Sequence, residues 1–232
     1  MLTRDFLRTA DCKTAFGDIE ESLLWSAEQR ASSLAATLAC RPDDGPVWIF
    51  GYGSLMWNPA MEFDESCPGT LVGWHRAFCL RLTAGRGTAC QPGRMLALKE
   101  GGRTTGVAYR LSEESLHDDL TLLWKREMIT GCYLPSWYKL SLDDGRVVNA
   151  LVFIMDPRHP LYESDTRAQT IAPLIAAASG PLGTNAQYLF SLEQELIKLG
   201  MHDDCLNELV GRVRMLLEGD KPGPEMVPGF AC

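Results

Sequence analysis

Residues 47–57 read VWIFGYGSLMW, and this stretch sets the fold that the rest of the chain has to complete. Its apolar first residues predict a short buried strand. The strand ends abruptly at Gly51 and Gly53, which flank Tyr52, and Ser54 follows. Glycines allow a positive φ and the close approach of a ligand, so consecutive N–H groups in this loop can converge on an anion. The alternative interpretation is a tight turn or bulge at the end of the strand.

The glycines of this loop match neither of the two common phosphate-binding patterns. No Gly-Lys-Ser/Thr follows them, as a P-loop requires, and the third glycine of a dinucleotide fingerprint is missing. A carboxylate fits such a loop, and phosphate is disfavoured.

Segments with β character continue beyond the loop. They are short, rich in apolar residues and separated by glycine-containing turns, and they cover residues 71–82, 95–99, 104–111, 137–142 and 147–155. Asp143-Asp144-Gly145 predicts a β-hairpin, and Glu100-Gly101-Gly102 predicts a turn between two strands. The pattern of about six strands predicts an α+β fold, a mixed sheet or β-barrel with flanking helices.

Helical patterns frame the predicted strands. Residues 11–38 lack proline and end before the breaker cluster at 41–46, which predicts an N-terminal helical extension. Ser112 is the predicted N-cap of a helix that runs to about Met128. Residues 187–217 predict two helices broken near Gly200. The chain therefore divides into an extension (1–45), a main domain (46–218) and a C-terminal tail (219–232).

The charge of the chain limits its partners. The 232 residues carry a formal net charge of −8, without a clustered Lys/Arg stripe. Nucleic acid and anionic membranes are therefore poor partners, because both need long-range attraction to positive charge. An anionic substrate would have to be bound by local donors, such as backbone N–H groups or single arginines. We expect a monomer or a weak dimer.

The eight cysteines show neither a C-x-x-C pair nor a Cys/His cluster at metal-ligand spacing, so we expect no metal site. Charged residues such as Arg4, Asp5 and Arg8 interrupt the first segment, which argues against a secretory signal. The longest apolar runs are too short to span a bilayer. We expect free thiols and a cytoplasmic location.

One acidic residue falls on the apolar face of the helix after Ser112. Leu116, Leu120 and Leu123 recur at helical spacing and define the face turned to the core. Glu127 continues this series, whereas Arg126 is predicted to point elsewhere. A buried carboxylate must be paired, neutralised or exposed to a cavity, and desolvation raises its pKa toward the range useful for proton transfer.

Alternatives for these charged groups stay open at this point. Glu127 can bend out to water at the helix end, or pair with an arginine such as Arg81 or Arg94. Arg81, Arg86 and Arg94 lie near glycine-containing turns, where they could clamp a substrate carboxylate or simply be solvated. No acid or cysteine constellation surrounds the histidines, so we expect all of them to be non-catalytic: His75, His117, His159 and His202.

The string FGYGSLMW at residues 50–57 resembles the signature of the ChaC family of glutathione-specific γ-glutamylcyclotransferases. Further segments resemble the family in the same order along the chain: 72–74 (VGW), Arg81, 93–94 (GR), 105–111 (TGVAYRL), 124–127 (WKRE), 131–133 (GCY) and 179–190 (SGPLGTNAQYLF). The segment before Val47 is absent from shorter members, and Cys132 stands where those members resemble Gly-Gly-Tyr. Several ordered motifs are far more specific than any single one.

The resemblance implies a mixed barrel with flanking helices, in which Glu127 is the proton-transferring acid/base. It also implies a substrate-binding loop that consists of Gly51, Tyr52, Gly53, Ser54, Leu55 and Met56. Tyr133 and Tyr188 are further candidates for the substrate pocket. We expect Tyr52 to be structural and Ser54 to contribute a backbone N–H or a polar contact, since no histidine is placed to activate its hydroxyl. Whether the loop holds the α-carboxylate or the oxyanion stays open.

The implied activity is that of a lyase that converts glutathione to 5-oxo-L-proline and L-cysteinylglycine. The α-amine of the substrate attacks its own γ-carbonyl, so the reaction requires neither a metal nor a cofactor. One alternative is a cyclotransferase for other γ-glutamyl amino acids or amines. Another is a non-enzymatic regulator of cation transport.

Overall fold

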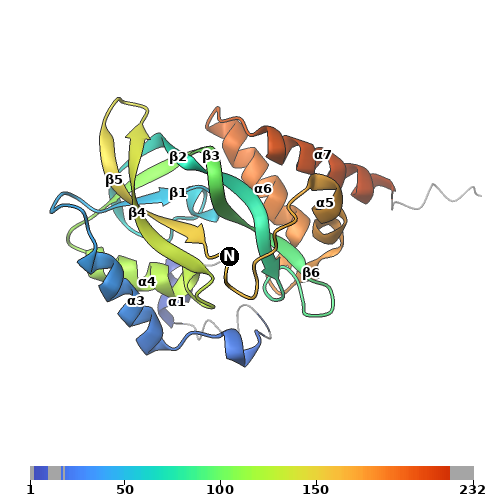
Figure 1. Cartoon of the computed structure of the whole chain (residues 1–232), viewed down its shortest axis with the longest axis horizontal. Helices are drawn as coiled ribbons and strands as arrows, with labels where there is room; N and C mark the ends of the chain where they lie inside the picture. The colour runs from blue at the N-terminus through green and yellow to red at the C-terminus, as the bar shows by residue number, and fades with distance from the viewer. Residues whose placement is uncertain (1–2, 10–16, 18, 220–232) are drawn as a thin grey trace, which may run out of the picture.

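A closed β-barrel forms the centre of the computed structural model, which describes residues 3–9, 17 and 19–219. The strands follow the order β1-β3-β2-β4-β5 around the barrel, and only the pairing of β1 with β5 is parallel. Their bounds are β1 Trp48–Gly51, β2 Phe63–Leu82, β3 Gly93–Leu111, β4 Tyr133–Leu142 and β5 Val147–Met155. The predicted α+β fold with a mixed barrel is confirmed, with five barrel strands in the described residues (Figure 1).

The predicted turn at residues 100–102 is wrong, which explains why five strands form the barrel and not about six. Strand β3 runs without a break through Gly101 and Gly102, whose φ angles are +105° and +67°. Strand β2 shifts its register between Val72 and Trp74 on the opposite side of the same ladder, where Gly73 has a φ of +91°. The glycines therefore let two long paired strands bend together, because they accommodate a β-bulge at this level.

The predicted hairpin after β4 is confirmed. The Leu142 N–H donates to the Arg146 carbonyl oxygen at 2.8 Å, and Gly145 has a φ of +91°. A glycine in the left-handed region is what a short hairpin loop of this kind requires. The hairpin fixes the register in which Tyr133 at the start of β4 faces Met155 at the end of β5.

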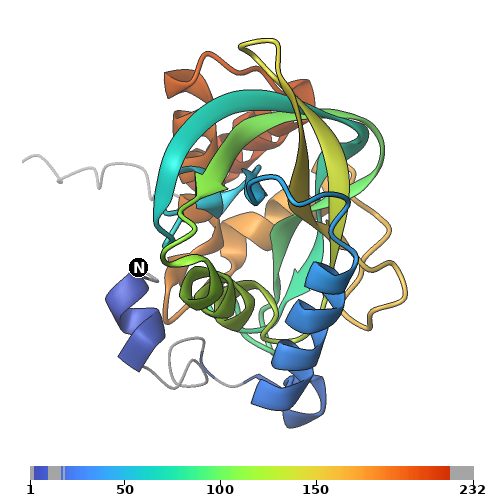
Figure 2. The ribbon, with the colours of Figure 1, turned by 90° about the vertical axis from the view of Figure 1, so that its left-hand side faces the viewer.

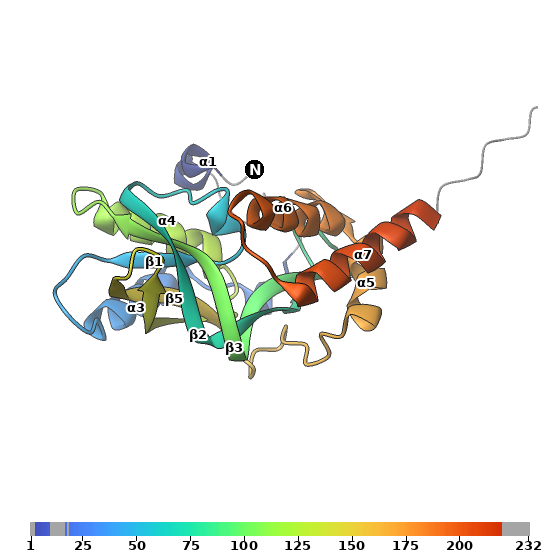
Figure 3. The same cartoon turned by 90° about the horizontal axis from the view of Figure 1, so that it is seen from above.

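Two groups of helices flank the barrel on opposite sides, as Figures 1 and 3 show. One group consists of α1 (Arg4–Thr9), α3 (Ala27–Ala39) and α4 (Leu116–Glu127), and the other of α5 (Ala168–Ala177), α6 (Asn185–Lys198) and α7 (Asp204–Gly219). The predicted break near Gly200 between two C-terminal helices is confirmed. The sequence did not predict α5, which contains Pro173, or the small hairpin of β6 (Ser179–Gly180) and β7 (Gly183–Thr184) that follows it.

Two predicted helix starts are wrong. Helix α3 begins after Ser26, whose hydroxyl accepts a hydrogen bond from the Gln29 N–H in a capping box, and a short 3-10 turn, η1 (Glu21–Leu23), precedes it. Residues 11–16 of the predicted N-terminal helix lie outside the described residues. Helix α4 begins after Ser115 and not after Ser112, and the Ser115 hydroxyl donates to Asp119 at 2.6 Å.

The core joins the barrel interior to the helices on both sides. Phe50 of β1 and Phe153 of β5 are fully buried, and Trp124 of α4 stacks edge-on against Phe153 with 5.3 Å between ring centroids. This contact places the C-terminal end of α4 at the end of the barrel. In the described part of the chain, no helix is long and apolar enough to cross a membrane. Residues 220–232 of the predicted tail lie outside that part.

Asn185 joins α6 to the barrel through both ends of its amide. The side chain is fully buried, its Oδ1 accepts from the Arg94 N–H at 2.8 Å, and its Nδ2 donates to the Arg94 carbonyl at 2.9 Å. The Asn185 amide thus makes with Arg94, at the start of β3, the two backbone hydrogen bonds that a neighbouring strand would otherwise make. Both backbone groups of Arg94 would lose their partner if this side chain were removed.

We expect Asn185→Ala to lower the free energy of unfolding by roughly 1–3 kcal/mol for each buried backbone group left without a partner. Urea unfolding followed by circular dichroism measures this loss. Asn207→Ala is the matched control, because Asn207 is exposed on α7, and it should change stability by less than about 0.5 kcal/mol. Equal stability of the two variants would contradict the proposed bracing role of Asn185.

Candidate active site

A cavity of about 470 Å³ lies at one end of the barrel. Its walls come from the loop after β1, the ends of β2 and β5, the starts of β3 and β4, the C-terminal end of α4, and α6. The volume falls in the range of about 300–1,000 Å³ that small-molecule sites occupy. Most of the residues predicted for the site line this cavity: Tyr52, Gly53, Ser54, Leu55, Glu127, Tyr133 and Tyr188.

Gly51 and Met56 are not among the residues that line the cavity. A Cβ atom added to Gly51 would lie 3.1 Å from the Leu55 Cβ and 3.2 Å from the Tyr109 Cε2, so a side chain there would crowd the loop from behind. The Met56 side chain is buried, and its carbonyl oxygen accepts from the Tyr109 hydroxyl at 3.0 Å. These two residues hold the loop in place and do not face the cavity.

The loop between them turns sharply into the cavity wall. Gly53 precedes the 3-10 turn η2 (Ser54–Met56), and the Met56 N–H closes the turn on the Gly53 carbonyl at 2.9 Å. A Cβ atom at Gly53 would lie 3.0 Å from the Tyr188 Oη and 3.2 Å from the Leu96 Cδ2. The first N–H groups of a helical turn have no partner within that turn, so this loop has donors suited to an anion.

Glu127 is the last residue of α4, and its side chain reaches the cavity. The side chain is 17% exposed, while its Oε1 atom is shielded from solvent and no donor among the described residues is aligned with it as a hydrogen bond. The Arg126 Nε lies 2.9 Å from this oxygen as a charged contact. Burial raises the pKa of Glu127, and the positive charge of Arg126 opposes part of that rise.

The prediction that Arg126 points away from the site is wrong. The Arg126 side chain is buried, lines the cavity, and donates from Nη2 to the Ser54 Oγ at 2.8 Å and from Nη1 to the Asn58 carbonyl. Helical periodicity missed it because a long side chain in the last turn can bend back toward the barrel. The signal that could have revealed it is the neighbouring acid, since a buried carboxylate needs a partner.

Neither Arg81 nor Arg94, the two partners proposed for Glu127, forms an ion pair with it in the described part of the chain. Arg94 does not line the cavity and approaches Glu163 at 3.5 Å. Arg81 and Arg86 do line the cavity, and the Arg86 Nη1 donates to the Thr184 carbonyl at 2.9 Å.

The charges around the cavity favour an anionic ligand. Among the described residues, its lining contains three arginines, Arg81, Arg86 and Arg126, and one carboxylate, that of Glu127. Arginine stays protonated even where burial lowers its pKa, as it does for Arg86. The site is therefore locally cationic within a chain whose formal net charge is −8.

Three buried tyrosines complete the wall near Glu127. The Tyr52 hydroxyl donates to the Phe153 carbonyl at 2.6 Å, and the Tyr133 hydroxyl donates to the Leu96 carbonyl at 3.2 Å. Tyr188 packs against Trp57 with 5.6 Å between ring centroids. Burial and the negative charge of Glu127 raise the pKa of all three phenols, so they stay neutral donors at physiological pH.

No side chain in the described part of the lining is an activated nucleophile. Burial raises the pKa of the Cys132 thiol to about 12, so this cysteine is protonated and unreactive near neutral pH. None of the four histidines lines the cavity, so Ser54 has no histidine beside it there to accept its proton. Within the described ranges, no group of three or more His, Cys, Asp and Glu side chains could hold a metal ion.

The chain is similar to several known proteins. A family model described as ChaC-like protein matches residues 47–216. The chain is 83% identical to the glutathione-specific gamma-glutamylcyclotransferase of Escherichia coli, over 100% of both chains. It is 36% identical to gamma-glutamylcyclotransferase 2-3 of Arabidopsis thaliana, over 74% of this chain and 90% of that relative.

The fold is also found in a solved structure. The crystal structure of a gamma glutamyl cyclotransferase specific to glutathione from yeast is similar to this chain with a TM-score of 0.69 and 22% identity. The match covers 74% of this chain and 97% of that chain. At this level of identity the likeness concerns the fold.

The buried pair of Arg126 and Glu127 generates a stability prediction. Arg126→Met leaves the Glu127 carboxylate buried without its cation, and we expect the free energy of unfolding at pH 7 to fall by roughly 3–5 kcal/mol. The pKa of Glu127, already raised in the folded protein, should rise further. A carboxyl group with a raised folded pKa costs stability only above its unfolded pKa, so the deficit should shrink as the pH falls toward 4.

Urea unfolding at pH 7 and at pH 5 measures this dependence. The double variant Arg126→Met with Glu127→Gln is the control, because a neutral amide cannot carry the buried charge. It should show a smaller loss that does not grow between pH 5 and pH 7. A loss for Arg126→Met alone that is the same at both pH values would contradict the interpretation.

Proposed function

Since the chain belongs to the ChaC-like protein family, we propose that it is a glutathione-specific γ-glutamylcyclotransferase. The products are 5-oxo-L-proline and L-cysteinylglycine. The observation that carries the proposal is the buried carboxylate of Glu127, which shares one cavity with the loop of Gly53, Ser54 and Leu55. The 83% identity to the Escherichia coli relative over the full chain supports the same substrate.

The reaction is an intramolecular acyl transfer. The α-amine nitrogen of the γ-glutamyl group forms a bond to its own γ-carbonyl carbon, and the amide bond from that carbon to the cysteine nitrogen breaks. One proton leaves the attacking amine and one proton reaches the departing amine, so no water is consumed. The protein has to bend the substrate so that amine and carbonyl meet, stabilise the oxyanion and move the proton.

Glu127 suits the proton transfer. As a carboxylate it removes a proton from the substrate amine, and as an acid it returns the proton to the leaving nitrogen. Burial raises its pKa, which makes the carboxylate a stronger base than an exposed glutamate and brings it closer to the operating pH. The positive charge of Arg126 opposes part of this rise, and Arg126 also bonds to Ser54.

The substrate-binding assignments follow from the walls of the cavity. The N–H groups of the Gly53–Ser54–Leu55 turn face the γ-glutamyl end of the substrate and bind its α-carboxylate or the oxyanion. Tyr133 and Tyr188 line the same end, and Tyr52 supports it. Gly51 and Met56 act from behind the loop, where they fix its course.

Several broader assignments belong to the same proposal. Residues 46–218 form the catalytic domain, in accord with the range 47–216 that the family model matches. The enzyme acts in the cytoplasm as a monomer or weak dimer. The cysteines in the described part of the chain are free, which fits a reducing compartment: Cys40, Cys67, Cys79, Cys90, Cys132 and Cys205.

We expect Glu127→Gln to lower the release of 5-oxoproline from glutathione by about 10²-fold or more, because the amide cannot accept the proton. The measurement is chromatographic detection of 5-oxoproline, with circular dichroism to verify that the variant is folded. Glu208→Gln is the control, since Glu208 is exposed on α7, and it should keep wild-type turnover. A folded Glu127→Gln variant with substantial turnover would disprove the assigned mechanism.

The same assay separates the alternative functions. Wild-type turnover of γ-Glu-Ala at a rate similar to that of glutathione would replace the glutathione assignment with a broader cyclotransferase. A non-enzymatic regulator would release no 5-oxoproline from either compound.

The raised pKa of Glu127 also sets the pH dependence of the reaction. The base has to be ionised, so kcat/KM should fall as the pH drops through the pKa of Glu127 in the free enzyme. Because burial raises that pKa, the fall should occur above the pH at which an exposed glutamate titrates. Initial rates between pH 4 and pH 9 measure the midpoint. A rate that stays constant down to pH 4 would rule out Glu127 as the base.

A further inference from the structure

A segment before the family-matched region crosses the mouth of the cavity. We define the N-terminal strap as residues 17 and 19–25, since residue 18 lies outside the described residues. At one end of the strap, a Cβ atom on Gly17 would lie 3.3 Å from the Pro181 Cγ, in the connection between β6 and β7. Ile19 follows and lines the cavity. The family model matches only from residue 47, so the strap lies outside what that match describes.

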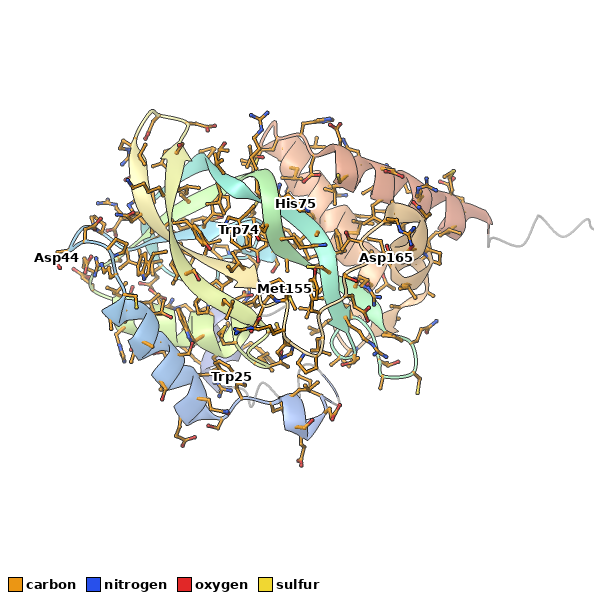
Figure 4. All side chains as sticks on the ribbon, viewed as in Figure 1. Trp25, Asp44, Trp74, His75, Met155 and Asp165 are labelled. Atoms are coloured by element: carbon orange, nitrogen blue, oxygen red, sulfur yellow. The ribbon has the colours of Figure 1, made fainter. Side chains whose placement is uncertain are left out.

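The other end of the strap is anchored beside Glu127. The Trp25 N–H donates to the Ile129 carbonyl at 2.9 Å. The Trp25 ring covers Gly131, where an added Cβ atom would lie 1.9 Å from the Trp25 Cε2. The strap therefore docks on the connection between α4 and β4, and Figure 4 shows Trp25 next to the start of α3.

Apolar packing holds the strap on α4, and an ion pair holds α1 on the same helix. Ile19 and Leu24 pack against a small cluster of buried side chains, Leu7, Leu122 and Ile129. Arg4 of α1 forms an ion pair with Asp119, which is fully buried on α4. Figure 2 shows α1 and α3 on opposite sides of α4. The strap is therefore fixed to the helix that carries Glu127.

The opposite rim of the mouth is fixed as well. The Leu182 N–H donates to the Gly85 carbonyl at 2.8 Å, which ties the β6–β7 hairpin to the loop after β2. Leu182 and Gly85 both line the cavity. Because Gly17 contacts the hairpin and Trp25 contacts the α4–β4 connection, the strap spans the two rims, and Ile19 lies between them.

We propose that Ile19 is a specificity-determining residue, which forms with Ile129 and Leu182 an apolar outer wall that contacts the Cys-Gly half of glutathione. This inference rests on the function proposed above. The γ-carbonyl of the substrate has to reach Glu127, whose Oε1 is shielded from solvent, so the γ-glutamyl end occupies the inner part of the cavity. The leaving Cys-Gly half then extends toward the rim, where Ile19 is partly exposed. Contacts with this remote half supply binding energy that selects glutathione over smaller γ-glutamyl compounds.

The test separates the two halves of the substrate. In Ile19→Ala, the KM for glutathione and the product-inhibition constant of Cys-Gly should rise together by about three- to tenfold, because apolar contact area is lost. The inhibition constant of 5-oxoproline, which has no Cys-Gly half, and kcat should both stay near their wild-type values. Ile197→Ala is the matched control, since Ile197 is 68% exposed on α6, and it should change none of these constants.

Ile19 also packs against Leu122 of α4 and its neighbours, so Ile19→Ala could act through lost packing alone. A second variant separates lost packing from lost substrate contact. Ile19→Leu keeps the apolar volume and should restore a KM near that of the wild type. A folded Ile19→Ala protein with wild-type KM would overturn the inference, and so would an equal rise in the inhibition constants of both products. These outcomes leave the proposed function intact. Failure of the wild-type protein to release 5-oxoproline from glutathione would overturn both.

Discussion

The contact between the Arg126 guanidinium and the Glu127 carboxylate is the constraint on which the rest of the site depends. A carboxylate at the C-terminal end of a helix faces the negative end of the helix dipole, and burial adds to the cost of its charge. Arg126 offsets that cost from 2.9 Å away, and its other N–H groups bond to Ser54 and to the Asn58 carbonyl. One guanidinium thus joins α4 to the glycine loop.

The barrel supplies the rigidity that this contact needs. Trp124 of α4 packs on Phe153 of β5, and the amide of Asn185 holds α6 against the start of β3. The cavity therefore has walls from segments that are distant in sequence but fixed to one sheet. The reaction requires a flexible substrate to bend. Fixed walls favour it, because the groups that bind the substrate are already in position before each turnover.

Local and overall charge act in opposite directions in this protein. The chain is acidic overall, whereas the described part of the cavity lining contains three arginines and one carboxylate. We propose that the two carboxylates of the substrate are bound by donors at short range, where the low dielectric strengthens each contact. The net charge of the chain weakens such contacts little, since solvent ions screen charges more than about 10 Å apart.

The sequence by itself determined the features that depend on neighbouring residues. It predicted most of the barrel strands, the hairpin at Gly145, the glycine loop around Tyr52, and the position of Glu127 on the apolar face of a helix. These follow from periodicity and turn chemistry, which act over a few residues. The ordered motifs added the family and its expected reaction.

Only the tertiary structure decided the features that depend on distant pairing. Gly101 and Gly102 look like a turn in isolation, but they form a bulge because β2 stays paired to β3 on both sides of them. Arg126 turns inward because Ser54 and Asn58, about 70 residues earlier, are there to accept its protons. Ile19 reaches the cavity because Trp25 docks on Gly131. Such contacts join residues that are far apart in the sequence, so local sequence patterns do not predict them.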